Sequence, residues 1–310
     1  MKCAFCEDEV VYVRQYDKMA LCIHHFNEQM KKRVQRTITK HKMLKRDDRI
    51  AIGVSGGKDS IALLEIMTKI ETDFPNCEII AVTIDEGIGK YREEGMIYAK
   101  KNVERHNLEH HIYSFKNDFG YELDEIIAKL GKRGKGRDFG ACSYCGILRR
   151  KILNQAAQEI GADVLLTAHN LEDEAETVLL NIVRGDIQRL ARLDPQPKKI
   201  HPSLVPRAKP FRNTPQAEIV MYCYLNDLEY QEIQCPYAVE AYRGEVREFI
   251  FKTQENQPML AFNILRGHEK LLKMIKTIPS KKELKDCQIC GEATTSDYCK
   301  GCWLKSQLNS

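Results

Sequence analysis

The chain has 310 residues, which at roughly 150 residues per domain is enough material for about two domains. Hydrophobic residues make up 43% and charged residues 30%, a composition that excludes a membrane protein and a disordered chain. Because no stretch approaches the roughly 20 apolar residues of a bilayer span, and the N-terminus lacks a signal-peptide pattern, we expect a cytoplasmic protein with no membrane partner. Lys and Arg number 48 against 44 Asp and Glu, so net charge alone does not indicate nucleic acid.

Each end of the chain carries four potential metal ligands. The N-terminal set is Cys3, Cys6, Cys22 and His25, and the C-terminal set is Cys287, Cys290, Cys299 and Cys302. Cys-x-x-Cys pairs place two thiolates on one tetrahedral ion, and sulfur and nitrogen ligands of this kind select zinc and leave no open position. The alternative, unligated buried cysteines, would require a core that these apolar-poor segments lack. We therefore predict two structural zinc fingers, with the two-residue spacing favouring His25 over His24.

Two basic stretches lie outside the fingers. Between Lys31 and Arg46 there are eight Lys or Arg and no acid, in a segment that can be helical, and a second, glycine-rich stretch occupies residues 132–137. One such run alone is typical of a solvated surface. Two runs beside zinc modules favour a polyanionic partner.

Between the fingers, short apolar runs alternate with helical patterns. Strands are predicted at 49–54, 78–84, 110–115, 163–168 and 229–234, and helices at 60–67, 92–107, 149–160 and 172–183. This alternation predicts an α/β fold with a doubly wound, mostly parallel sheet, helices on both faces, and ligands at the carboxyl ends of the strands. The expected organisation is a zinc finger at 1–27, a basic linker helix at 28–48, a catalytic domain at 49–280 and a second finger at 281–310.

A glycine-rich loop connects the first predicted strand to the first predicted helix. Its residues are Gly53, Val54, Ser55, Gly56, Gly57, Lys58, Asp59 and Ser60. The glycines let backbone amides face a phosphate, and the helix N-terminus and Lys58 add positive potential. It is not a Walker A loop, because Asp59 stands where that motif has Ser or Thr. We predict a phosphate-binding loop, with a plain glycine-rich turn as the alternative.

Five cysteines lie outside the fingers. Cys223 lies within a helical pattern and is expected to be an ordinary buried residue, and Cys77 precedes the second strand, at the sheet edge opposite the ligand. In a parallel sheet, Cys142, Cys145 and Cys235 can converge near the phosphate loop. Three thiolates suit a [4Fe–4S] cluster with one open iron, whereas a redox pair at Cys142 and Cys145 that carries a persulfide fits the spacing about equally well.

From the first finger to the last, the chain resembles the TtcA/TtuA family of tRNA thiolases, and within it the group of TtuA and the archaeal and eukaryotic wobble-uridine thiolases. The shared motifs are the two fingers, Ser55–Ser60, Cys142-x-x-Cys145 with Gly146 and Arg149-Arg150, Thr167–Asn170 with Asp173, Gly185-Asp186 with Arg189–Arg192, Lys209–Arg212 and Cys235–Ala238. The six residues Ser55–Ser60 resemble the pyrophosphate-binding loop of the N-type ATP pyrophosphatases. One departure is Arg149, where some members carry a catalytic lysine. A guanidinium keeps the positive charge but does not transfer a proton.

The resemblance implies ATP-dependent 2-thiolation of a tRNA uridine, with U34 favoured and U54 possible. ATP with Mg²⁺ would lie over the loop, where Lys58 and Asp59 act on its phosphates. Ile84 would hold the adenine, and His169 and Arg149 would line the same edge.

The resemblance also implies that Cys142, Cys145 and Cys235 hold the [4Fe–4S] cluster. Asp173 is a candidate general acid/base, with stabilisation of a helix N-terminus as its alternative role. The sulfur donor would be sulfide or a ubiquitin-like thiocarboxylate, and a homodimer is expected.

Two other functions are compatible with parts of the pattern. An adenylating enzyme with another nucleophile, as in lysidine synthesis, would use the loop but not the three central cysteines. A zinc-finger RNA-binding adaptor with an inactive nucleotide-sensing core would release no pyrophosphate in the presence of tRNA.

Overall fold

The computed structural model describes residues 1–71, 76–130, 140–238, 243–275 and 283–309. The second basic stretch, 132–137, lies outside the described residues. No helix among the described residues has the length and apolarity needed to cross a membrane.

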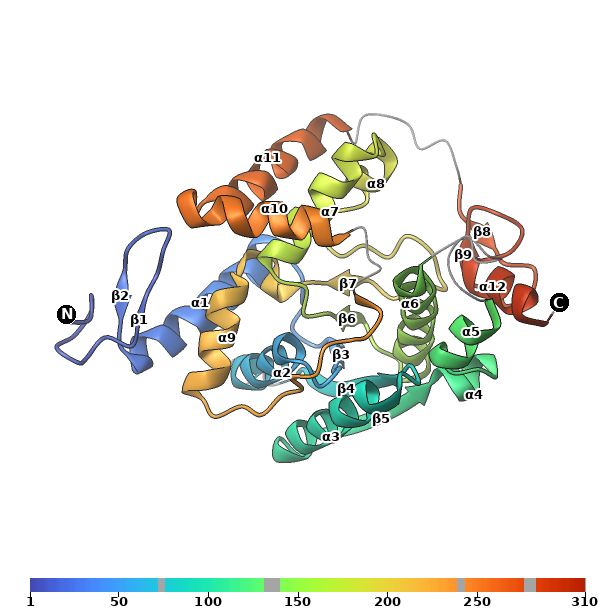
Figure 1. Ribbon diagram of the computed structural model, residues 1–310, viewed down its shortest axis with the longest axis horizontal. Coiled ribbons are helices and arrows are strands. Elements are labelled where there is room, and N and C mark those ends of the chain that lie inside the picture. Colours follow the sequence, from blue (N-terminus) through green and yellow to red (C-terminus); the bar gives the residue numbers. More distant parts are fainter. Residues whose placement is uncertain (72–75, 131–139, 239–242, 276–282, 310) are drawn as a thin grey trace.

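A five-stranded parallel sheet forms the centre of the molecule (Figure 1). Its strands are β3 (Arg49–Gly53), β4 (Glu78–Asp85), β5 (Glu109–Ser114), β6 (Val164–Leu166) and β7 (Arg207–Ala208), in the order β5-β4-β3-β6-β7. The chain winds outward from β3 first through β4 and β5, then through β6 and β7, so the order reverses between β3 and β6. Ligands of such sheets bind outside the carboxyl ends of the strands at this switch point.

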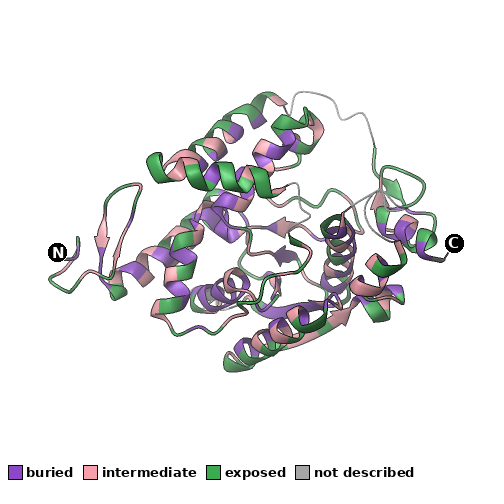
Figure 2. Cartoon of the chain, viewed as in Figure 1, coloured by how far each residue is buried: buried purple, intermediate pink, exposed green. Residues whose placement is uncertain are grey.

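Helices cover both faces of the sheet, as the alternation predicted. Ile50 and Ile52 of β3 point into one core, together with α1 (Ile23–Lys40), α2 (Lys58–Glu71), α3 (Gly89–Arg105) and α9 (Gln216–Leu225). Ala51 points into the other, which includes α4 (Phe115–Phe119), α5 (Leu123–Leu130), α6 (Ala141–Glu159) and α12 (Lys300–Asn309). Because both faces of the central strands are buried (Figure 2), they read as continuous apolar runs rather than as alternating patterns.

A third cluster of helices lies beyond β6 and β7. It contains α7 (Leu171–Val183), α8 (Ile187–Ala191), α10 (Arg243–Asn256) and α11 (Leu260–Ile275), packed around a separate set of apolar side chains. The short 3₁₀ helix η1 (Pro210–Asn213) follows β7. This cluster places α7 and α10 beside the carboxyl ends of the strands.

The two ends of the chain form small modules at opposite sides of the molecule (Figure 1). The N-terminal hairpin of β1 (Tyr12–Val13) and β2 (Ala20–Leu21) leads into α1. The C-terminal hairpin of β8 (Lys285–Asp286) and β9 (Ala293–Thr294) leads into α12. Helix α1 starts inside the first ligand set and continues through the basic stretch to Lys40.

Two local predictions are wrong. Residues 229–234 do not form a strand: Gln231 makes one isolated parallel bridge to Gly57, and the edge strand is instead the two-residue β7. Helix α6 begins at Ala141 rather than at 149, so Cys142 and Cys145 lie inside its first turns and not before it. In the first case a tertiary contact overrides the local pattern, because the 229–234 segment is held by the phosphate loop and not by a neighbouring strand.

Candidate functional site

The phosphate loop makes its sharp turn at Gly56, whose φ is +87°. A Cβ atom at this position would lie 2.0 Å from the carbonyl oxygen of Gly95 in α3. A Cβ on Gly95 would in turn meet the carbonyl oxygen of Ser55 at 3.0 Å. Both glycines are therefore required, one for its left-handed backbone and both for the close approach of loop and helix.

Hydrogen bonds from two other segments hold the carbonyl groups of the loop. Arg92 Nη1 donates to the Ser55 carbonyl at 2.6 Å, and the Gln231 amide donates to the Gly56 carbonyl at 2.9 Å. The hydroxyl oxygens of Ser55 and Ser60 lie 3.1 Å apart. With its carbonyls held this way and α2 beginning at Lys58, the loop has the geometry of an anion site.

Polar side chains connect the loop to the N-terminus of α7. Lys58 Nζ lies 2.7 Å from Asp59 Oδ2, and Asn170 Nδ2 donates to Asp59 Oδ1 at 3.1 Å. Asn170 and Asp173 form a reciprocal capping box, in which Asp173 Oδ2 accepts from the Asn170 amide. The other oxygen, Oδ1, lies 3.6 Å from Arg243. The capping role of Asp173 is thus present in the structure, and its acid/base role stays a prediction.

A cavity of about 1010 Å³ lies at the carboxyl ends of the strands. The predicted site residues on its wall are Gly53, Val54, Ser55, Gly57, Asp59, Ser60, Ile84, Arg149, His169 and Asp173. Gly56, Lys58, Cys142, Cys145 and Cys235 are not on the wall. The parallel sheet therefore brings the loop, the end of β4, the middle of α6 and the start of α7 to one cavity.

His169 lies on the cavity wall, where its Nδ1 is 3.0 Å from the hydroxyl of Thr167. The surrounding protein atoms, followed by the nearby Lys209 ammonium, hold the pKa of His169 below its ordinary value, although the side chain remains exposed to the cavity. Lys209 itself is 2.5 Å from Glu174. At neutral pH His169 is therefore an uncharged hydrogen-bonding group.

The three central cysteines lie beside this cavity, at the N-terminal end of α6 and in the segment after Gln231. Cys142 Sγ donates to the carbonyl of Tyr237 at 3.4 Å, and the Tyr237 hydroxyl donates to Asp124 at 2.7 Å. Burial raises the pKa of the Cys145 thiol to about 12, and Arg149, Cys235 and Cys142 are among the groups that act on it. The structure thus brings Cys142, Cys145 and Cys235 into one neighbourhood.

The spacing of these thiols differs from that of a mononuclear site. Among the described residues, the ligand groups whose atoms all lie within 4.8 Å are the two terminal sets, and the three central cysteines do not form such a group. A cluster of four irons holds its thiolates farther apart than one ion does. The three central thiols are therefore not assembled around a single-ion site in the way that the terminal sets are.

Cys77 and Cys223 lie elsewhere. Cys223 is fully buried in α9, and burial raises its pKa to about 12. Cys77 lies at the start of β4, where its Sγ donates to the carbonyl of Arg46 at 3.2 Å. Neither reaches the three central cysteines, as the sequence predicted.

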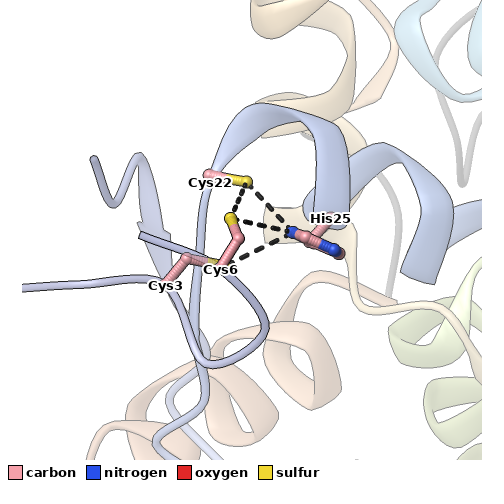
Figure 3. A group of neighbouring side chains, drawn as sticks. All are labelled: Cys3, Cys6, Cys22 and His25. Atoms are coloured by element: carbon pink, nitrogen blue, oxygen red, sulfur yellow. Dashed lines mark hydrogen bonds between the residues drawn. The ribbon is translucent and has the colours of Figure 1, made fainter. Parts of the chain in front are cut away.

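The N-terminal ligand set is assembled as expected (Figure 3). Cys6 and Cys22 Sγ lie 3.7 Å apart, and His25 Nδ1 is 3.3 to 3.5 Å from the three sulfurs. A tetrahedral zinc ion with Zn–S bonds of about 2.3 Å and a Zn–N bond of about 2.0 Å would set these distances near 3.8 and 3.5 Å. The residues fit zinc, and His25 rather than His24 occupies the fourth position.

The C-terminal set has a similar geometry and an additional neighbour. Cys290 and Cys299 Sγ lie 3.7 Å apart, and the Cys299 amide donates to Cys287 Sγ at 3.2 Å. Lys151 of α6 places its Nζ 3.2 Å from Cys290 Sγ, 3.8 Å from Cys299 Sγ and 2.6 Å from Glu292. This module is therefore attached by a cation to the helix that carries Cys142 and Cys145.

Sequence reasoning missed several groups of the site. Arg243 and Arg247 of α10 both bind the buried carboxylate of Glu176 and line the cavity. Their four-residue spacing indicates a shared helix face, but no local signal shows that the face meets α7. Arg92 and Gln231, which support the loop, are likewise recognisable only in the folded chain.

Comparisons with known proteins agree with this geometry. Residues 25–254 match the model of the PP-loop domain family. The chain is 35% identical over 325 residues to the tRNA 2-thiolation protein NcsA of Haloferax volcanii, covering 100% of both, and 33% identical over 314 residues to the cytoplasmic tRNA 2-thiolation protein 1 of Saccharomyces cerevisiae, covering 99% of this chain and 86% of the relative. Among solved structures, the U34-tRNA thiolase NcsA from Methanococcus maripaludis with its [4Fe-4S] cluster matches with a TM-score of 0.85 at 33% identity, covering 99% of this chain and 96% of that one.

Proposed function

Because this chain belongs to the PP-loop family of tRNA 2-thiolation proteins, we propose that it is an ATP-dependent tRNA uridine 2-sulfurtransferase. The observation that carries the proposal is one cavity that joins the phosphate loop after β3 to the middle of α6, the helix whose first turns carry Cys142 and Cys145. U34 is the favoured target, since the solved relative is a U34-tRNA thiolase, and U54 is the alternative.

ATP with Mg²⁺ is the nucleotide substrate of this proposal. The loop amides and the hydroxyls of Ser55 and Ser60 would hold its phosphates, and Lys58 would offset negative charge as pyrophosphate leaves. Asp59, on the wall, is the kind of oxygen ligand that Mg²⁺ takes. The backbone of Ile84 at the end of β4 would bind the adenine.

The chemistry follows from the poor leaving ability of a carbonyl oxygen. The C2 oxygen of the uridine attacks the α-phosphorus of ATP, and the bond to the β-phosphate oxygen breaks to release pyrophosphate. Hydrosulfide then attacks C2 and loses its proton, and AMP leaves with the original oxygen. The products are thiouridine, AMP and pyrophosphate.

The wall residues have distinct parts in this scheme. Arg149, held 3.4 Å from Glu86, would stabilise negative charge on the phosphates and does not transfer protons. His169, neutral at pH 7, would contribute hydrogen bonds. Asp173, also on the wall, is the candidate for proton transfer.

Cys142, Cys145 and Cys235 are the proposed protein ligands of a [4Fe–4S] cluster. Three ligands leave one iron open, and the bound cluster would supply a site for hydrosulfide. The proximity of the three cysteines around α6 supports this assignment, as does the cluster of the solved relative. A persulfide on Cys142 or Cys145 is the competing mechanism.

The remaining assignments are also proposals. The two terminal sets would hold structural zinc, and the fingers and basic stretches would bind tRNA phosphates. The chain would comprise a finger at 1–27, a linker helix at 28–48, a catalytic domain at 49–280 and a finger at 281–310. Sulfide or a ubiquitin-like thiocarboxylate is the donor, the protein is a homodimer, and its location is cytoplasmic, as the names of eukaryotic relatives suggest.

The decisive experiment is anaerobic purification with iron, sulfide and zinc analysis, followed by incubation with unmodified tRNA, ATP and sulfide. Mass spectrometry of the nucleosides should detect 2-thiouridine, and the nucleotide product should be AMP. Production of ADP would contradict the proposed bond cleavage, and full activity without iron would favour the persulfide. Absence of both thiouridine and pyrophosphate would favour the RNA-binding adaptor.

A further inference from the structure

The charged side chains on the cavity wall are unevenly paired. The ion pairs of the wall carboxylates are Asp59 with Lys58, Glu86 with Arg92 and Arg149, Asp173 with Arg243 and Arg247, Glu174 with Lys209, and Asp194 with Lys198. The wall residue Arg212 pairs with Glu269, outside the cavity. Within the described part of the chain, three wall arginines have no carboxylate within 4.0 Å, and these are Arg150, Arg192 and Arg207. The wall therefore carries excess positive charge at these three positions.

Arg207 is held against the backbone of α6 at Arg150, within range of the Arg150 charge. Arg207 Nη2 donates to the carbonyl of Arg150 at 2.9 Å. Partial burial, followed by the Arg150 charge, lowers the pKa of Arg207 to about 10. Like charges brought together without a counter-ion are unfavourable in the free protein, and an anion placed between them removes that repulsion.

The position of Arg150 indicates which kind of anion would bind between these arginines. Its guanidinium folds back along α6, so that a Cβ atom on Gly146 would meet Nη1 at 3.2 Å. It therefore lies one turn nearer to the cysteine-bearing end of the helix than its own Cα. Arg207 comes from β7, which is separated from the phosphate-loop strand β3 by β6. The arginines thus form a second positive region of the cavity, distinct from the phosphate loop.

We propose that Arg150 and Arg207, together with Arg192 on the same cavity wall, form a second phosphate-binding site that takes a backbone phosphate of the tRNA strand next to the target uridine. This inference rests on the proposed function. The loop on β3 provides for the phosphates of ATP, whereas a uridine that reaches the cysteine-bearing end of α6 must bring its flanking phosphates to this side of the cavity. Guanidinium groups suit a backbone phosphate because they can donate two parallel hydrogen bonds to its oxygens.

The test compares Arg150→Gln and Arg207→Gln with Arg266→Gln, an exposed arginine of α11 that is not on the wall. Binding of an unmodified tRNA transcript is measured without ATP or sulfide at several salt concentrations, and ATP binding is measured separately. Each wall variant should reduce the slope of log K against log salt by about 0.7 to 0.9 and weaken tRNA binding, with ATP affinity unchanged. Arg207→Lys keeps the charge and should keep most of the slope, which separates charge loss from misfolding.

Several results would overturn the site. One is an unchanged salt slope of tRNA binding in both wall variants, and another is an equal loss of slope in Arg266→Gln. Weaker ATP binding with intact tRNA binding would assign the arginines to the nucleotide instead. Failure of the proposed function is recognised separately. A wild-type protein that binds tRNA with the expected salt dependence but forms no thiouridine would refute the function and leave the site standing.

Discussion

The N-terminal and C-terminal metal modules have similar ligand geometry but different charge and attachment. With Zn²⁺ bound, three thiolates and a histidine would give the N-terminal site a net charge of −1, and four thiolates would give the C-terminal site −2. Lys151 contacts the more negative site, with its Nζ 3.2 Å from Cys290 Sγ. Partly buried charge is stabilised by a nearby opposite charge, and donors around a metal site orient its ligands.

The attachments of the two modules differ as well. The N-terminal module continues into α1, which buries Phe26, Met30 and Val34 in the main core. The C-terminal module is attached to α6 by Leu304 and Leu308 of α12 and by Lys151. The N-terminal module is therefore joined to a core helix by chain continuity, whereas the C-terminal module depends on side-chain contacts with the helix that carries Cys142 and Cys145.

Removing one metal ligand from each module should have the largest effect on the protein. Structural zinc contributes about 10 to 16 kcal/mol of apparent binding free energy, so Cys6→Ser and Cys290→Ser should each reduce the zinc content from two ions to one and unfold their own module. Because the C-terminal module packs on α6, Cys290→Ser should also lower iron content, whereas Cys6→Ser should not. Metal analysis of anaerobically purified protein measures both. Unchanged zinc in Cys290→Ser would contradict the ligand assignment, and retained ATP binding in both variants controls for global unfolding.

Substitution of Lys151 tests the charge difference directly. Lys151→Met should speed zinc transfer from the C-terminal module to a chelator by about 10- to 100-fold, the range typical of lost outer-sphere partners, and leave the N-terminal zinc unaffected. Lys285→Met is a matched control, because Lys285 lies in the same module and pairs with Asp297 at 2.5 Å. Equal release from both modules, or an equal effect of the control, would show that Lys151 has no special role.

Lowering the pH should weaken the contact between His41, just after α1, and Arg212. His41, just after α1, accepts a hydrogen bond from Arg212 at 3.3 Å, and burial, followed by the Arg212 charge, lowers its pKa to about 4. The unfolded chain binds this proton near pH 6.5, so below that value the unfolded state holds more protons and stability falls as pH approaches 4.

The expected loss is on the order of 1 to 2 kcal/mol by pH 5. His41→Asn should remove this part of the pH dependence, measured as the difference between the two denaturation curves at each pH. Parallel curves for variant and wild type from pH 7 to 5 would refute the assignment.

The smallest expected effect concerns the space around the Lys151 stem. A Cβ atom on Gly301 would lie 2.5 Å from Lys151 Cδ, so Gly301→Ala should displace this flexible side chain at a cost of about 1 kcal/mol. In a Lys151→Ala background the same substitution should be nearly neutral. A double-mutant cycle on zinc release measures the coupling, and additive effects would contradict direct contact.

The sequence alone determined the features whose residues are neighbours in the chain. Both ligand sets depend on short spacings, and the loop Gly53–Ser60 carries its own glycines, hydroxyls and helix start. The apolar runs of β3 and β4 were recognisable because strands buried on both faces need no polar alternation. The sequence also suggested that Cys142, Cys145 and Cys235 could converge, but on the basis of a strand at 229–234 that does not form, so their actual neighbourhood is a result of the tertiary structure.

Only the tertiary structure decided the contacts between distant segments. The two-residue strand β7 is too short to leave a recognisable pattern in the sequence. Gln231 supports the phosphate loop through one isolated bridge, although the segment around it has the sequence pattern of a strand. Arg207 meets the backbone carbonyl of Arg150, and Lys151 meets Cys290, because of where α6 lies against the sheet and the C-terminal module. Local propensity carries no information on such pairings, since their geometry is set by how helices and strands pack.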